Sequence, residues 1–156
     1  MERTNVHRMS SHRFQIMHCI IHTDGGARGN PGPAGIGVVV KNGKTGETLE
    51  RHSEYIGHTT NNQAEYRAVI LGLERCLALG AKEVDVIADS ELLIKQARGE
   101  YKVKNRDLAA RYMEMKNLET RIGRVHYAHV RREKNKEADA LANQAMDKGM
   151  RKSSLS

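Results

Sequence analysis

The apolar residues of this chain change their spacing abruptly, and that change limits the possible folds more than any other feature. Three runs in the first part of the chain have the alternation and the flanking turn residues of short strands. From Asn62 the apolar residues instead recur at helical spacing, until Gly80 ends the run. Shorter strand-like and helix-like runs follow. The pattern predicts the order βββαβααβα, an α/β fold of the mixed α+β kind that begins with an antiparallel meander.

The expected elements are short, and two of the strands end at an acidic residue. The first strand ends at Asp24 and the fourth at Asp89, and Ser90 is placed to cap the helix that follows. Strands are predicted over residues 19–23, 36–40, 47–56, 84–88 and 124–130, and helices over residues 62–80, 90–97, 107–118 and 136–146.

A chain of 156 residues is long enough for one domain with a real core. We expect a flexible basic extension over 1–17, a folded domain over 18–149 and a disordered tail over 150–156. No apolar run approaches the ~20 residues of a membrane helix, and no secretory signal is visible, so a cytoplasmic protein without membrane contact is expected. Cys19 and Cys76 are interpreted as reduced, buried thiols, with a single bridge between them left open.

The chain is basic, with 26 lysines and arginines against 19 acids, a formal charge of +7 and a pI near 9.6. A positive balance favours a polyanionic partner such as nucleic acid. Charge alone fits equally well with a basic protein that binds no nucleic acid specifically. The choice between these two depends on the motifs.

Four acids occupy positions from which they could meet. Asp24 and Asp89 follow strands, while Glu65 and Asp139 are expected in the first turns of the long helix and the last helix. If the two strands are neighbours in one sheet, Asp24 and Asp89 project at the same edge of the sheet, where ligand sites are common. All four carboxylates could then meet at that edge. Clustered carboxylates repel one another, and a divalent cation keeps them ionised near neutral pH. Magnesium is the natural ion, and manganese can take the same positions.

Two such ions, roughly 3.5–4 Å apart, can activate a water and stabilise the leaving oxygen of a phosphodiester. Hydrolysis then needs no protein nucleophile. Each acid by itself also fits an ordinary structural role: Asp24 as a turn residue, Asp89 at a helix start, and Glu65 or Asp139 as a partner of a helix dipole. The set as a whole, rather than any member, indicates the chemistry.

Four segments resemble, in order, the motifs of type 1 ribonuclease H. They are TDGGARGNPGPAGIG at 23–37, TTNNQAE at 59–65, ADS at 88–90 and NKEADALA at 135–142. The resemblance covers about residues 20–146. It implies a ribonuclease H-like fold with a five-stranded mixed sheet flanked by helices. It also implies endonucleolytic cleavage of RNA paired to DNA, leaving 5′-phosphate and 3′-hydroxyl ends. By the same resemblance, the catalytic and metal-binding acids are Asp24, Glu65, Asp89 and Asp139, with two ions per site when substrate is bound.

The resemblance also assigns nucleic-acid contacts. Asn30, Thr60 and Asn61 match positions that contact the backbone, and Asn62 and Gln63 match positions that read the RNA strand near its 2′-hydroxyls. Amides suit this task because they offer both donors and acceptors, and the 2′-hydroxyl is what separates RNA from DNA. For Asn61 or Asn62 taken alone, a helix cap remains an equal alternative.

The chain departs from the family pattern after the third motif. Many members carry a basic, tryptophan-containing helical protrusion there, whereas residues 101–108 follow the short helix directly and the chain has no tryptophan. We therefore expect the substrate to be bound by the basic N-terminal residues and by Lys102, Lys104, Asn105 and Arg106. The alternative is that these side chains form only a solvated face.

A second departure concerns the loop before the last acid. Some members place a histidine there, but residues 131–134 read RREK. Arg132 or Glu133 is the hypothetical replacement, because arginine can stabilise a departing phosphate and glutamate can carry a proton. His22, His126 and His129 lie on strands, where histidines are more often packed or exposed polar residues.

Three other functions remain open. A nuclease of the same fold could also accept double-stranded RNA, because a reduced grip on the DNA strand would relax selectivity. A non-catalytic hybrid-binding module is disfavoured, because clustered negative charges weaken the binding of a polyanion. A basic protein whose acids are incidental would bind nucleic acid without any effect of metal. In the leading hypothesis, a ribonuclease H, the partner is an RNA–DNA hybrid and the active form is a monomer.

Overall fold

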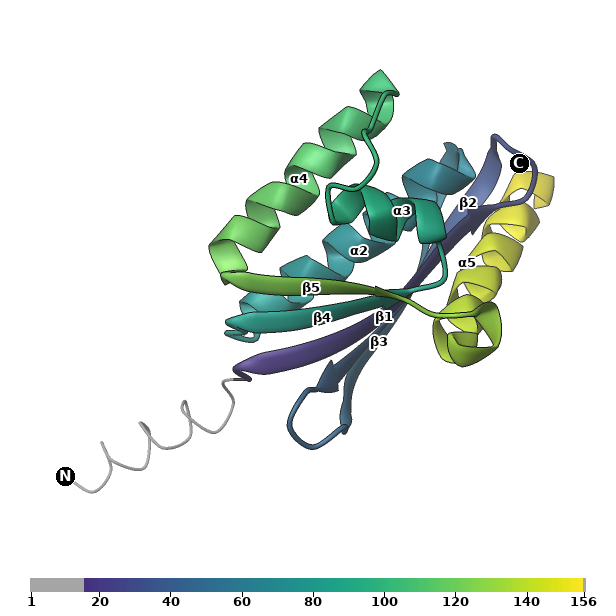
Figure 1. Ribbon diagram of the computed structural model, residues 1–156. Helices are drawn as coiled ribbons and strands as arrows, with labels where there is room; N and C mark the ends of the chain where they lie inside the picture. Colours follow the sequence, from purple (N-terminus) through teal and green to yellow (C-terminus); the bar gives the residue numbers. More distant parts are fainter. Residues whose placement is uncertain (1–15, 156) are drawn as a thin grey trace.

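The structure is a computed structural model that describes residues 16–155, with side chains as far as Arg151, and its elements follow the expected order (Figure 1). All but residues 16 and 17 of the N-terminal extension predicted over 1–17 therefore lies outside the described residues. The elements are β1 (His18–Ala27), β2 (Gly32–Asn42), β3 (Thr48–Thr59), α2 (Asn61–Ala78), β4 (Glu83–Ala88), α3 (Glu91–Ala97), α4 (Arg106–Ile122), β5 (Arg124–His129), the 3-10 turn η1 (Arg132–Lys134) and α5 (Lys136–Leu155).

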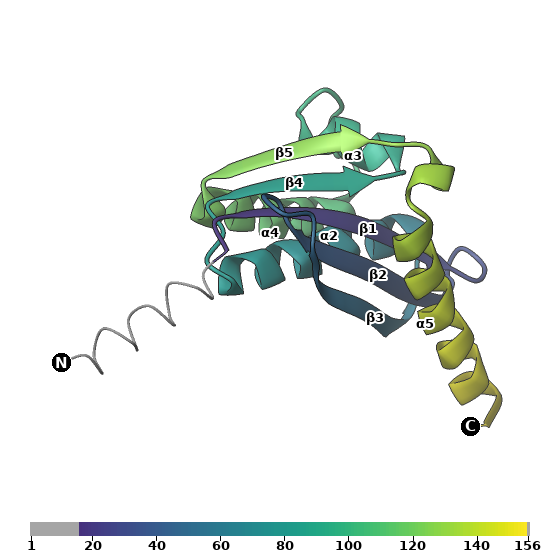
Figure 2. The same ribbon diagram turned by 90° about the horizontal axis from the view of Figure 1, so that it is seen from below.

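The five strands form one mixed sheet in the order β3-β2-β1-β4-β5. β1, β2 and β3 pair antiparallel, as the meander prediction requires, and β4 pairs parallel with both β1 and β5. Figure 2 shows the strands stacked in this order. The sequence prediction of a five-stranded mixed sheet flanked by helices is confirmed.

Helices cover both faces of the sheet. α2 packs on β1 and β2 with α4 beside it toward β5, while α5 crosses the opposite face over β1, β2 and β3 (Figures 1 and 2). The alternation along β1 explains this arrangement, because Cys19 and Ile21 point into the core while their neighbours are only partly buried. Ile21 and Val38 face Gly72 of α2, so the helix approaches the sheet closely. The main core thus lies between the sheet and the α2–α4 layer.

Polar residues cap three of the helices, and one of these caps, Ser90, was predicted from the sequence. The side chains of Thr60, Ser90 and Asn105 accept hydrogen bonds from backbone amides at the starts of α2, α3 and α4. Thr60 is therefore the cap of α2, and the alternative in which Asn61 or Asn62 takes that role is wrong. α4 follows α3 after residues 98–105 alone, so the predicted absence of an intervening helical protrusion is confirmed.

The first strand is longer than predicted. β1 continues through Asp24 to Ala27, because the glycine-rich residues after Asp24 pair with β2, as in the pairs Gly25 with Ile36 and Gly26 with Gly35. Asp24 therefore lies inside β1 rather than at its end. Pairing with β2 across the short connection that follows overrode the turn-type composition here.

The last helix is also longer than predicted. α5 continues to Leu155, so the expectation of a disordered tail over 150–156 is wrong as far as that residue. The reason is packing beyond Met146, where Gly149 is buried and lies so close to the ring of Tyr55 on β3 that an added Cβ would fall 2.1 Å from it. Contact with the sheet continues the helix past the motif.

Two further observations concern the sequence expectations. Within residues 16–155, no helix is long and apolar enough to cross a membrane. Cys19 on β1 and Cys76 on α2 are both buried free thiols, as the sequence indicated. Their side chains are hydrogen-bonded to each other, which raises the pKa of Cys76.

Candidate active site

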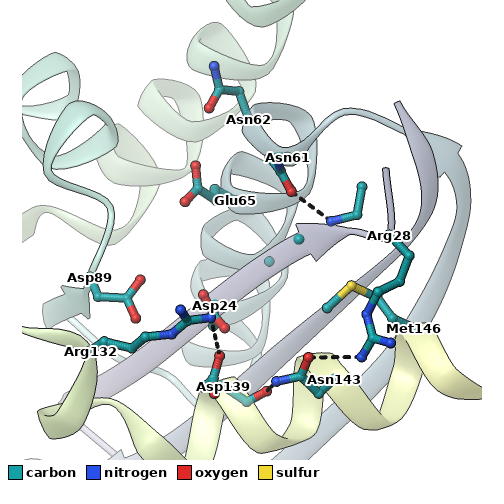
Figure 3. Close-up of a pocket in the computed structure, with 13 residues that line it drawn as sticks. Asp24, Arg28, Asn61, Asn62, Glu65, Asp89, Arg132, Asp139, Asn143 and Met146 are labelled. Atoms are coloured by element: carbon teal, nitrogen blue, oxygen red, sulfur yellow. Dashed lines mark hydrogen bonds and ion pairs between the residues drawn. The ribbon is translucent and has the colours of Figure 1, made fainter. Parts of the chain in front are cut away.

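The register of two parallel strands places the first two acids side by side. Thr23 of β1 is paired with Ala88 of β4, so the residues that follow them, Asp24 and Asp89, occupy adjacent positions where β4 ends. Ligand sites in open α/β sheets favour such carboxyl ends. Figure 3 shows the two carboxylates turned toward the same space.

The other two acids come from helices on opposite faces of the sheet. Glu65 is the fifth residue of α2, just past the first turn in which it was predicted, and Asp139 lies in the first turn of α5 as expected. Two glycines let these helices approach. A Cβ at Gly25 would fall 2.4 Å from the backbone of Ala64, and a Cβ at Gly37 would fall 2.2 Å from the carbonyl oxygen of Ala138.

The structure therefore brings all four predicted acids to one pocket, of about 550 Å³. Its rim includes several groups to which the sequence analysis gave no role. Arg28 donates to the side-chain oxygen of Asn143 (3.0 Å) and pairs with Asp147 (2.9 Å), which fixes the β1–β2 connection to α5 (Figure 3). The pocket is lined by Asp24, Gly25, Gly26, Ala27, Arg28, Asn61, Asn62, Glu65, Asp89, Arg132, Asp139, Asn143 and Met146.

Proton affinity is high at this cluster. Burial, followed by the charges of Asp89, Asp139 and Glu65, raises the pKa of Asp24 to about 8. Burial and Asp89 likewise raise the pKa of Glu65 to about 7, although a hydrogen bond from Ser90 opposes this. The pKa of Asp89 is also raised, chiefly by burial. These shifts express first the cost of burying a charged carboxylate and then the repulsion between neighbouring carboxylates.

Asn135 forms hydrogen bonds that connect it to two parts of the acid cluster. It is almost fully buried, and its amide donates to the carbonyl oxygen of Thr23 (2.9 Å), the residue before Asp24. The same side chain also forms a hydrogen bond that lowers the pKa of Asp89, against the larger effect of burial. Asn135 stands inside the fourth motif, but its spacing alone did not reveal that it links two of the acids.

The loop before α5 delivers one of the two predicted auxiliary residues to the pocket. Arg132 lines it and donates to Asp139 over 3.4 Å, and Asp139 is the main reason that the pKa of Arg132 is raised. Figure 3 shows the arginine reaching from η1 toward the acids. Glu133 is exposed on the same turn and does not line the pocket.

The predicted nucleic-acid contacts gather mostly in a second pocket, of about 750 Å³, which shares Asn62 with the first. Asn30, Thr60, Gln63 and Asn105 also line it. Lys104 is exposed but lies outside this lining, as does Lys102, whereas Arg106 and Arg111 belong to it. Arg111 was missed because it stands in an unremarkable helical sequence.

Hydrogen bonds hold these amides in place. The side chain of Asn61 lines the acid pocket and accepts from the backbone amide of Ala27 (2.8 Å), and Asn61 donates its own backbone N–H to Asn30 (3.0 Å). Arg111 donates to the side-chain oxygen of Gln63 (3.0 Å). The surface between the two pockets is therefore preorganised.

None of the three histidines considered in the sequence analysis, His22, His126 and His129, lines the acid pocket. Burial and Lys41 lower the pKa of His22. His126 pairs with Glu83 at the far end of β4, and His129 is exposed. This placement agrees with the expectation that histidines on strands are more often packed or exposed polar residues than catalytic groups.

Comparison with protein families gives the class of domain. The family model described as reverse transcriptase-like matches residues 22–145, which include all four acids. The match therefore spans the sheet, α2 and the part of α5 that carries Asp139.

Individual relatives narrow the class. A bifunctional protein of Mycobacterium tuberculosis is 45% identical over 131 residues, 84% of this chain and 36% of that protein. The ribonuclease H of Ruthia magnifica is 36% identical over 143 residues, covering 83% of this chain and 95% of that enzyme. The solved structure of LC11-RNase H1 from compost, in complex with an RNA/DNA hybrid, has a TM-score of 0.80 at 48% identity and covers 85% of this chain and 99% of that one.

The chain belongs to the ribonuclease H family. It spans little more than a third of the mycobacterial relative's length but nearly the whole of the Ruthia magnifica enzyme.

Proposed function

We propose that this protein is an endoribonuclease that hydrolyses the RNA strand of RNA–DNA hybrids in a metal-dependent reaction, leaving 5′-phosphate and 3′-hydroxyl ends. The observation that carries the proposal is the convergence on one pocket of Asp24, Glu65, Asp89 and Asp139, which come from β1, α2, the β4–α3 connection and α5. Membership of the ribonuclease H family, and a similar protein solved with an RNA/DNA hybrid, support the same substrate.

The donor set fits magnesium or manganese. All four acids offer hard oxygen ligands. The raised pKa values of Asp24 and Glu65 show that their ionised forms are disfavoured by burial and by neighbouring carboxylates, and a bound dication would favour the ionised forms. We propose that these four carboxylates hold two ions when substrate is bound. Bound ions of this kind supply an activated water and stabilise the leaving oxygen. Asn135 and Ser90 keep Asp89 and Glu65 oriented for this task.

The remaining residues are proposed to select and hold the hybrid. Arg111 occupies the side-chain oxygen of Gln63, so the Gln63 amide nitrogen is left to donate to an RNA 2′-hydroxyl or base edge. Asn62 belongs to both pockets and therefore stands between the cleaved strand and its partner. Other polar groups of the second pocket are positioned for the backbone of the DNA strand: Asn30, Asn105, Arg106 and Arg111.

The active form is proposed to be a monomer, because one chain supplies every residue of both pockets. The buried free thiols suit a reducing compartment, and the cytoplasm is the proposed location. Because residues 98–105 connect α3 to α4 without the basic protrusion of other family members, we propose that the second pocket binds the DNA strand. Double-stranded RNA is therefore the competing substrate to test.

The decisive experiment offers one labelled RNA strand annealed to DNA, annealed to RNA, or single-stranded. Wild type and Asp24→Asn are compared in magnesium, in manganese and in chelator. We expect cleavage of the hybrid alone, lost in chelator and reduced at least ~1,000-fold by the substitution, because a neutral amide is a much weaker ligand for a dication than a carboxylate.

Each other outcome has a distinct meaning. Equal cleavage of double-stranded RNA would establish the relaxed nuclease instead. Metal-independent binding of the hybrid without cleavage by the wild type would overturn the enzyme assignment. Lys148→Gln, an exposed change outside both pockets, is the matched control and should leave cleavage unchanged.

The auxiliary role of the loop is tested by two alanine substitutions. We expect Arg132→Ala to lower turnover about tenfold with a smaller effect on hybrid affinity, because its guanidinium lies among the acids where charge develops. Glu133→Ala should stay near wild type, since that side chain lies outside the pocket. Steady-state kinetics on the labelled hybrid give both values. Unchanged turnover in both variants would remove this loop from the reaction.

A further inference from the structure

A second group of metal-ligating side chains lies on the opposite end of the sheet from the acid pocket. His18 begins β1, and Glu83 and Asp85 lie in the first half of β4. One ligand atom from each of the three side chains lies within 4.8 Å of the other two. Asp24 is six residues further along β1 than His18, which places this group roughly 20 Å from the catalytic acids.

The backbone holds these side chains in a defined arrangement. His18 pairs with Glu83 in the parallel ladder, and the amides of Lys82 and Glu83 donate to the carbonyl oxygen of Met17 (2.8 and 3.1 Å). The ring of His18 packs on Gly43, where an added Cβ would fall 2.4 Å from Nδ1. Its other nitrogen, Nε2, lies 2.9 Å from a carboxylate oxygen of Asp85. The imidazole is thus aimed at the acids before any ion arrives.

The charge of the group is unusual for this basic chain. Within residues 16–155, the ion-pair partners of Asp85 and Glu83 are both histidines: His18 for Asp85, and His126 on β5, 3.3 Å away, for Glu83. No lysine or arginine of that part of the chain pairs with either carboxylate. When the histidines are neutral, the group carries two uncompensated negative charges, which attract a dication.

We propose that His18, Glu83 and Asp85 form a second divalent metal site, selective for zinc-type ions, with His126 close enough to complete it. Imidazole together with carboxylate is a donor set of zinc and related transition metals, whereas magnesium and calcium prefer oxygen alone. Ligands about 2.0–2.2 Å from a zinc ion lie about 3–4 Å from one another, so only small side-chain movements are required. The ion would tie β1 to β4 at the edge where the described chain begins.

The test is zinc binding, measured by calorimetry in wild type, His18→Gln, Asp85→Asn and Gly43→Ala. Each protein is titrated in the Asp24→Asn background as well, because the catalytic acids also take dications. We expect one zinc equivalent that persists in Asp24→Asn, weakens about a hundredfold in His18→Gln or Asp85→Asn, and weakens about tenfold in Gly43→Ala, where the ligand ring is displaced. His58→Gln, an exposed histidine on β3, is the matched control.

Two further readouts do not depend on a stable variant. In the wild type, zinc should shift the imidazole nitrogen resonances of His18 and His126 and leave those of His58 in place. A zinc concentration a hundredfold above Kd should raise Tm by about 5 °C. A separate control uses the variant: magnesium-supported hybrid cleavage by His18→Gln should equal that of wild type.

Three results would overturn the site. They are no micromolar zinc binding in the wild type, binding that disappears with Asp24→Asn alone, and binding unchanged in His18→Gln while the His18 resonances stay fixed. None of these results bears on the nuclease proposal, which is read out by metal-dependent cleavage instead.

Discussion

Replacing Asp24 with asparagine is expected to stabilise the metal-free protein at alkaline pH while abolishing its cleavage activity. The pKa of Asp24 is about 8 in the fold against an ordinary 3.8. Between those values the folded state binds more protons than the unfolded state, so stability falls as pH rises from about 4 to about 8. The asparagine variant lacks this loss and also relieves the repulsion on Glu65 and Asp89.

The size of the effect follows from the linkage between protonation and folding. Each unit of pKa shift corresponds to about 1.4 kcal/mol, and the shift of Asp24 is shared with the acids around it. We therefore expect metal-free Asp24→Asn to exceed wild type by about 2 kcal/mol or more in free energy of unfolding at about pH 9, and to match it near pH 4.

Urea denaturation in chelator across this pH range measures the difference. Asp107→Asn, an exposed acid in the first turn of α4, is the control and should not reproduce the pH dependence. Adding magnesium should stabilise wild type more than Asp24→Asn, because only the wild type retains the complete set of ligands. A wild type as stable at pH 9 as at pH 5 in chelator would show that repulsion among the acids is not what limits its stability.

The second large effect is expected from Gly37→Ala on β2. The added Cβ would lie 2.2 Å from the carbonyl oxygen of Ala138 and 2.7 Å from the amide nitrogen of Ala142, so the backbone of α5 itself must move. Overpacking of this kind costs about 3 kcal/mol. Because Asp139 follows Ala138, the same movement shifts a proposed metal ligand, and a displacement of about 1 Å is enough to lower turnover about 100-fold.

The measurement combines urea unfolding with hybrid cleavage well below the transition, where the variant is still folded. Gly26→Ala is the matched control for stability, because its Cβ meets the flexible end of Met146 at 3.3 Å rather than backbone. We expect it to lose less than about 1 kcal/mol. If Gly37→Ala were as stable and as active as wild type, the close approach of α5 to β2 would not be what positions Asp139.

Local patterns allowed much of this protein to be predicted from its sequence. The element order, the meander and the helix cap Ser90 depend on side chains a few residues apart, and spacing reports such interactions directly. The cap of α2 was not predicted, because Thr60, Asn61 and Asn62 all have side chains suited to that position. The four acids could be named because each stands in a distinctive segment that resembles a ribonuclease H motif.

Other features depend on contacts between different elements of the fold. β1 continues past Asp24 because β2 pairs with it, and α5 continues to Leu155 because β3 packs against it. The roles of Asn135 and Arg111 were not predictable, because each acts on a residue 112 or 48 positions away.

The sequence by itself identified the four acids that we propose as metal ligands, and it predicted on what kind of element each stands. Only the tertiary structure decided how they meet. The β1–β4 register sets Asp24 beside Asp89, and Gly25 and Gly37 admit the helices that carry Glu65 and Asp139. The same register sets His18 beside Glu83 at the other end of the sheet. Periodicity reports which face of an element is buried, whereas register and close approach arise only when the whole core packs at once.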